Sequence, residues 1–121
     1  MEDVDEVTAP FLVSDLAQEV RSLLLEHSPH GADIGPATAV VFETFGELLR
    51  DPNDGPVIFL AVAAWQLQNQ QLLEPIRDAA LALIDSGDAQ RAYRQTDATI
   101  DLQKKTALTK LAAALREATV R

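Results

Sequence analysis

The chain contains no cysteine, and aromatic residues are few, with four Phe, one Trp and one Tyr among 121 residues. The absence of cysteine excludes disulfide bonds, thiolate metal sites and cysteine nucleophiles, and it fits a reducing compartment, so we expect a cytoplasmic protein. A core with so few rings has to be built from aliphatic side chains of the kind that helices pack well.

Long apolar runs and a basic N-terminus are also missing. The longest apolar run, residues 57–65, is far shorter than the roughly 20 residues that a helix needs to cross a bilayer. Residues 1–6 carry four acids and no base, the reverse of the start of an export or mitochondrial signal. We therefore expect no membrane partner and no targeting segment.

Positive charge is scarce in the first half of the chain. Residues 1–60 hold twelve acidic residues against Arg21 and Arg50, while the whole chain carries a net charge of −9. Such a surface repels phosphate groups, so we expect no nucleic-acid partner, whereas a basic protein surface would be attracted to it. The alternative interpretation is that the acidic residues serve solubility alone.

No recognisable catalytic or metal-binding pattern is present. His27 and His30 are separated by a helix-breaking proline, which removes the spacing that a helical metal site needs. Residues 51–55 resemble the start of a calcium loop, but Pro56 and Val62 stand where Gly and Glu are required. A nucleophile elbow and a phosphate-binding loop are also missing. We therefore predict no enzyme activity, no catalytic residue, no metal site and no cofactor.

What the sequence does contain is aliphatic residues repeated every three to four positions, in segments separated by Pro and Gly. After Ser14, for example, Leu16, Val20, Leu23 and Leu24 fall on one helical stripe. The pattern predicts an all-α fold, a single-domain bundle of about five helices. We place these helices at residues 14–28, 36–50, 55–70, 74–86 and 97–118.

The third predicted helix has no polar face over residues 57–65, which is typical of a helix surrounded by neighbours, so we expect it to be central. Asp54 is predicted to cap this helix, and Gly87 to end the next one in a left-handed conformation. Residues 1–10 are acidic and end at a proline. We expect them to be a disordered acidic lead-in to a single helical domain over residues 11–121.

Three strings resemble a family pattern. They are FxxSDxAxxVR at residues 11–21, DPNDGPVIFLAVAAWQ at residues 51–66, and RDAALALIDSG at residues 77–87. In these strings the chain resembles a family of small uncharacterised bacterial all-helical proteins. The resemblance implies a bacterial origin and a helical architecture, and it implies no activity.

Size, acidity and missing chemistry favour an acidic protein-binding module of immunity or antitoxin type that covers a basic protein partner. The acids predicted to bind are Glu19, Glu26, Glu43, Glu47, Asp51 and Asp54. One alternative is a structural protein that self-associates, as a homodimer, through the apolar third helix. A second alternative is a small-ligand pocket bordered by Trp65, Gln66 and Tyr93, since an aromatic ring beside an amide can hold a flat polar molecule.

Overall fold

The computed structural model describes residues 4–28, 34–96 and 101–120. Over these residues the regular structure is helical, and the β-type contact is an isolated parallel bridge between Leu72 and Val120, which confirms the all-α class. The α-helices are α1 (Val4–Thr8), α2 (Asp15–His27), α3 (Ile34–Thr44), α4 (Asp54–Gln68), α5 (Glu74–Ser86), α6 (Asp88–Thr96) and α7 (Asp101–Glu117). Two short 3-10 helices, η1 (Ala9–Phe11) and η2 (Leu48–Arg50), complete the set that the structure describes.

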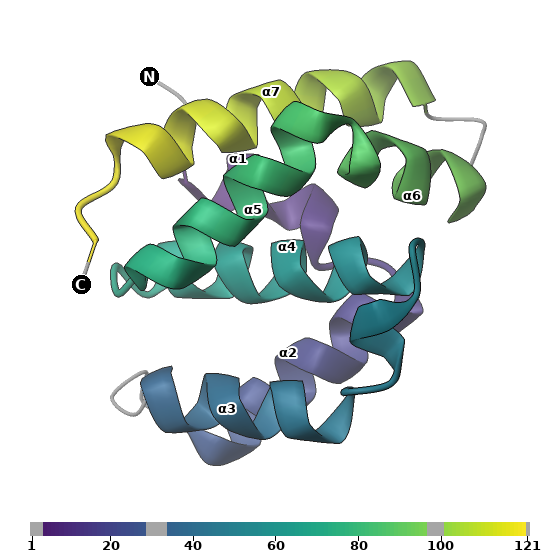
Figure 1. Cartoon of the computed structure of the whole chain (residues 1–121). Coiled ribbons are helices and arrows are strands. Elements are labelled where there is room, and N and C mark those ends of the chain that lie inside the picture. The colour runs from purple at the N-terminus through teal and green to yellow at the C-terminus, as the bar shows by residue number, and fades with distance from the viewer. Residues whose placement is uncertain (1–3, 29–33, 97–100, 121) are drawn as a thin grey trace.

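Helix α4 lies across the middle of the molecule, with α2 and α3 on one side of it and α1, α5, α6 and α7 on the other (Figure 1). Twelve of its fifteen residues are buried. Because apolar side chains project from every side of α4, helices on both sides of it bury their own apolar stripes against it. None of the described helices combines the length and apolar character needed to cross a membrane.

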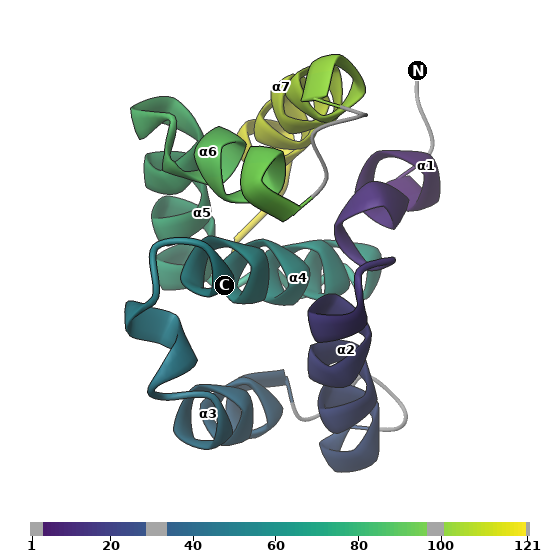
Figure 2. The same ribbon diagram turned by 90° about the vertical axis from the view of Figure 1, so that its right-hand side faces the viewer.

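Helix α2 begins where the sequence predicts it. The backbone of Ser14 is extended, and its Oγ accepts a hydrogen bond from the N–H of Ala17 at 3.2 Å, which satisfies one of the unpaired donors of the first turn. The predicted stripe is buried at Val20 and Leu24. Seen from the side in Figure 2, α2 runs vertically while α3 is viewed nearly end-on, so the two helices cross steeply.

The helix predicted at residues 36–50 is interrupted. Helix α3 ends at Thr44, a turn follows, and η2 covers Leu48–Arg50. Gly46 stands in that turn, where glycine costs a helix up to about 1 kcal/mol relative to alanine. Pro52 then holds Asp51 in an extended conformation, with φ −74° and ψ 131°, so the chain leaves η2 as a sharp turn into α4.

The C-terminal half follows the prediction more closely. Helix α5 has the predicted bounds, and Gly87 adopts φ +87° at its C-cap, where its N–H donates to the Ile84 carbonyl at 3.2 Å. Helix α6, Asp88–Thr96, is not among the five predicted helices. Helix α7 runs to Glu117, while the predicted start of the last helix, at residue 97, lies outside the described residues.

The N-terminal segment differs from the prediction of a disordered lead-in over residues 1–10. Residues 4–8 form α1, and Val7 and Thr8 are buried. The Thr8 hydroxyl donates to the Val4 carbonyl at 2.7 Å and accepts from the Gln68 amide of α4 at 2.7 Å. Phe11 packs edge-on against Tyr93, with ring centroids 5.7 Å apart. Residues 1–3 of the predicted lead-in lie outside the described residues.

A buried polar network ties the C-terminal end of α4 to its neighbours. The Gln66 amide nitrogen donates to the Thr38 hydroxyl of α3 at 2.9 Å, and the Gln66 amide oxygen accepts from the Leu73 N–H at 3.0 Å. The Thr38 hydroxyl in turn donates to the Ile34 carbonyl at 2.7 Å. One side chain thus fixes α3, α4 and the turn before α5 relative to one another.

Candidate functional site

Three surface hollows adjoin one another around α2, the end of α3, η2 and the start of α4. The first, here called the α2 hollow, has a volume of about 610 Å³, and the second, the junction hollow, about 490 Å³. These two share Thr44 and Phe45 in their linings. The third, the proline hollow, also measures about 490 Å³ and shares Arg50 with the junction hollow.

The α2 hollow lies between one face of α2 and the end of α3. Its α2 residues recur at three- and four-residue spacing, so they share a single helix face. They are Asp15, Gln18, Glu19, Ser22, Leu23 and Glu26, and Thr44 and Phe45 complete the lining. The three carboxylates are exposed, whereas Leu23 and Phe45 are half-buried and form the apolar part of the lining.

The junction hollow lies where α3 gives way to η2. It is lined by Glu43, Thr44, Phe45, Gly46, Glu47, Leu48 and Arg50. Glu43 and Glu47 are exposed, as the sequence predicts for an acidic edge. Leu48 keeps 37% of its surface exposed, so it is one of the few large apolar residues among those described that are exposed rather than buried or half-buried.

Carboxylates dominate these two hollows, which together we call the acidic groove. Five acids line it, Asp15, Glu19, Glu26, Glu43 and Glu47, and Arg50 is the one base among the described residues of the lining. The ion pairs of the described residues involve Arg77, Arg91 and Arg116, and none includes an acid of the groove. In the part of the chain that the structure describes, the acids of the groove therefore form no ion pair, and five carboxylates face the single positive charge of Arg50.

Asp51 and Asp54, also predicted to bind a partner, have different positions. The Asp51 carboxylate accepts hydrogen bonds from the N–H groups of Asn53 at 2.8 Å and Asp54 at 2.9 Å, and these bonds hold the pKa of Asp51 below its usual range. Asp51, rather than the predicted Asp54, thus caps the start of α4 with its side chain. Asp51 lines the proline hollow, whereas Asp54 lines none of the three hollows.

Asp51→Ala should lower the thermal stability of the protein at neutral pH, because the N–H groups of Asn53, the N-cap residue, and Asp54, the first residue of α4, lose their acceptor. A lowered folded-state pKa means that the stabilisation is fully present above the usual pKa of 3.8 and is lost as the pH falls through the lower folded value. The difference in Tm between the wild type and Asp51→Ala should therefore hold between pH 7 and 5 and shrink below about pH 4.

Circular dichroism melts at several pH values measure this difference. Asp54→Ala is the matched control, because the Asp54 carboxylate makes no comparable hydrogen bond among the described residues. A Tm difference for Asp51→Ala that is as large at pH 3 as at pH 7 would contradict the assignment of the cap.

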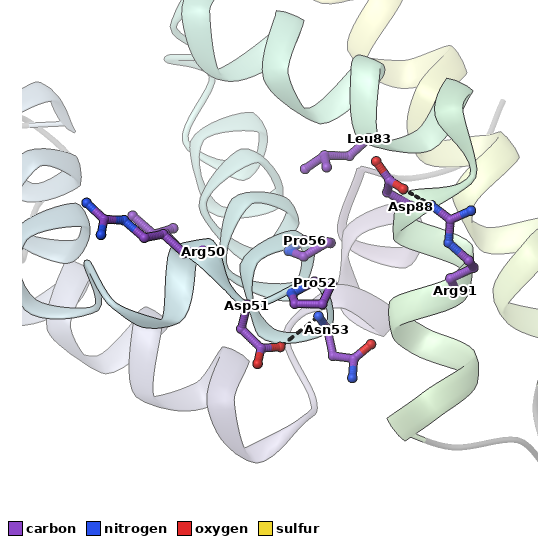
Figure 3. Close-up of a pocket in the computed structure, with 9 residues that line it drawn as sticks. Arg50, Asp51, Pro52, Asn53, Pro56, Leu83, Asp88 and Arg91 are labelled. Carbon is purple, nitrogen blue, oxygen red and sulfur yellow. Dashed lines mark hydrogen bonds and ion pairs between the residues drawn. The ribbon is translucent and has the colours of Figure 1, made fainter.

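The proline hollow does not gather polar groups at one point. Leu49, Pro52, Pro56 and Leu83 form its apolar lining. Asp88 is paired with Arg91, and the Arg50 side chain points away from this pair (Figure 3). Among the described residues no group of three or more acidic or histidine side chains could hold a metal ion; His30, considered above as a ligand, lies outside them.

The predicted ligand pocket is not an open pocket. Trp65, Gln66 and Tyr93 are 2%, 0% and 4% exposed, and none of them lines the three hollows. The Gln66 amide is engaged by Thr38 and Leu73, and burial raises the pKa of the Tyr93 hydroxyl. All three residues therefore belong to the core. Gln66 can be buried among apolar neighbours because its amide is hydrogen-bonded.

Phe45 lies inside the helix predicted at residues 36–50, and it is not among the predicted site residues. In the structure Phe45 follows the end of α3, is half-buried, and lines both parts of the acidic groove. Gly46, the next residue, is the sequence feature nearest to this break, but it is a weak signal.

Comparison of the chain with protein-family models, with curated proteins and with solved structures finds no match. The resemblance to a bacterial helical family therefore stays a prediction, and the geometry of the groove is the basis for a functional proposal.

Proposed function

We propose that the chain is a protein-binding module that covers a basic surface of a partner protein with the acidic groove. The observation that carries this proposal is the arrangement of five carboxylates, none of them in an ion pair among the described residues, around the apolar residues Leu23, Phe45 and Leu48. An apolar centre with a charged rim is the usual composition of a protein interface.

The charge of the groove favours a basic partner. Complementary potentials accelerate association and disfavour wrong partners, and they require no catalytic group. Binding that blocks a basic active surface is the mode of an immunity or antitoxin protein, which we infer as the biological role. A cytoplasmic, bacterial setting is part of this proposal; it rests on the missing cysteine and on the family resemblance.

The alternative of self-association through the apolar central helix finds less support. The apolar residues of α4 are buried within one chain, so they are not free to contact a second copy. Of the six predicted binding acids, Glu19, Glu26, Glu43 and Glu47 carry the proposal. Asp51 lines the adjoining proline hollow, so the proposed binding surface includes it, whereas Asp54 lines none of the three hollows and is left out of that surface.

The test compares two variants with the same change in net charge. The groove variant is Glu19→Gln, Glu26→Gln, Glu43→Gln and Glu47→Gln. The control variant replaces exposed acids on α1, α5 and α7, and it is Glu6→Gln, Glu74→Gln, Asp85→Asn and Glu117→Gln. Each protein is immobilised and exposed to bacterial lysate, and the captured proteins are quantified by mass spectrometry.

We expect a basic protein to be captured by the wild type and by the control variant, with capture lost in roughly 0.5 M NaCl because salt screens exposed charges. With that partner purified, the groove variant should associate at least about tenfold more slowly than the control variant. If no basic protein depends on the groove acids for capture, the proposed function is wrong.

A further inference from the structure

Phe45 occupies the boundary between the two parts of the acidic groove. Its backbone is held by two hydrogen bonds, from its N–H to the Val41 carbonyl at 2.9 Å and from the Leu49 N–H to its carbonyl at 3.0 Å. Phe45 packs against the core cluster, is half-buried, and lines both hollows. An aromatic residue anchored in the core is thus placed at the boundary of the two hollows.

Carboxylates lie in both hollows that this ring borders. Glu19 and Glu26 line the α2 hollow, and Glu43 and Glu47 line the junction hollow. A cation that enters either hollow meets an aromatic ring and negative charge together. Both features attract cations, because the ring face carries a negative quadrupole and the carboxylates carry full charge.

Arginine matches this combination better than lysine. The guanidinium group is planar, stacks on aromatic rings, and can donate two parallel hydrogen bonds to one carboxylate. The lysine ammonium is a compact, strongly hydrated charge without a flat face. A groove with carboxylates alone would distinguish the two cations less well than one that also contains a ring.

We propose that the acidic groove binds an arginine-bearing segment of its partner, with one arginine side chain stacked on Phe45 and hydrogen-bonded to the neighbouring glutamates. This inference rests on the proposed function and specifies the chemistry of the partner. Leu48, exposed at the edge of the same groove, offers apolar contact to the stem of that side chain.

The test uses two fluorescein-labelled peptides of equal length and charge, one with four arginines separated by serines and one with lysines in their place. Fluorescence anisotropy at about 0.1 M NaCl, where the Debye length is about 10 Å, gives the two dissociation constants. We expect the arginine peptide to bind about fivefold more tightly, the range of an exposed cation–π contact. Phe45→Leu should remove this preference while both peptides still bind.

Two variants serve as controls. Phe45→Tyr keeps the ring and should keep the preference. Phe59→Leu makes the same type of change at a ring that packs on Phe42, 5.1 Å away between centroids, and should also keep it. As a measurement that needs no substitution, the ring-proton resonances of Phe45 should shift on titration with the arginine peptide and not with the lysine peptide.

The outcomes separate this inference from the proposed function. Equal affinity of the wild type for the two peptides, or an absence of shifts at Phe45, overturns the arginine assignment and leaves a basic partner in place. Failure of both peptides to bind counts against the acidic groove as a basic-partner site altogether. A groove closed by a second copy of this chain, seen as a dimer in light scattering that the arginine peptide cannot dissociate, also overturns the assignment.

Discussion

Gly55→Ala should lower the free energy of unfolding by about 3 kcal/mol, at the upper end of what overpacking costs. Gly55 is buried in the first turn of α4, where the chain passes close to η2. A Cβ atom at this position would lie 2.5 Å from the Leu49 carbonyl oxygen and 3.2 Å from the Leu49 carbonyl carbon. Both are backbone atoms, so α4 and η2 would have to move apart.

Gly35→Ala is the matched control for this substitution. Gly35 also lies in the first turn of a helix, α3, but a Cβ atom there would meet nothing within 4 Å. Alanine is favoured over glycine in a helix by up to about 1 kcal/mol, so this variant should be neutral or slightly more stable. Urea unfolding followed by circular dichroism measures both, and equal effects of the two changes would contradict the close approach of η2 and α4.

Gln66→Leu should lower the free energy of unfolding by a similar amount, about 3 kcal/mol. The substitution leaves the Leu73 N–H without its acceptor and removes the amide that donates to the Thr38 hydroxyl. An unsatisfied N–H costs about 1–3 kcal/mol, and the lost hydrogen bond to Thr38 adds about 1 kcal/mol, although the Thr38 hydroxyl keeps its bond to the Ile34 carbonyl. Hydrogen exchange at the Leu73 N–H should also become faster.

The control is Gln90→Leu, at a half-buried position on α6. This variant should change stability little. A double-mutant cycle with Thr38→Val isolates the contact between α3 and α4, because the two substitutions remove the same hydrogen bond and should be less than additive. Strict additivity would show that Gln66 and Thr38 do not interact.

Local signals in the sequence were sufficient for much of the fold. Ser14 predicts the start of α2 because its hydroxyl can reach a first-turn N–H, and Gly87 predicts the end of α5 because few other residues adopt φ > 0. Both depend on residues only a few positions apart. The apolar repeats in between fix the helical period, which does not depend on distant contacts.

Other features depend on contacts between distant segments. A single glycine at position 46 costs too little to predict a helix break, and the break becomes visible only with η2 packed on α4. Residues 1–10 hold four acids and few large apolar residues, a composition that predicts disorder. The composition therefore gave no indication that Val7 is buried in the core. Gln66 was predicted to border a ligand pocket. Its hydrogen-bond partner Thr38 lies 28 residues away in the sequence, so the sequence pattern did not reveal that the amide is already engaged.

The candidate site was predictable in part. Glu43 and Glu47 are four positions apart in a predicted helix, which predicts their common exposure. Both are exposed, although α3 ends at Thr44 and Glu47 lies beyond it. Their proximity to the α2 hollow follows from the steep crossing of α2 and α3, which periodicity does not reveal. The capping role moved from Asp54 to Asp51 because Pro52 holds Asp51 extended, with its carboxylate facing the N–H groups that follow.

The position of α4 between two groups of helices has a consequence for biosynthesis. When α4 leaves the ribosome, α1 and α2 can already pack against it, but α5 and α6, which cover part of its other side, have not been made. At about 5–20 residues per second, the uncovered side of the nascent chain stays open to water for several seconds. During that interval we expect the apolar segment Ile58–Trp65 to be accessible to chaperones that bind aliphatic sequences.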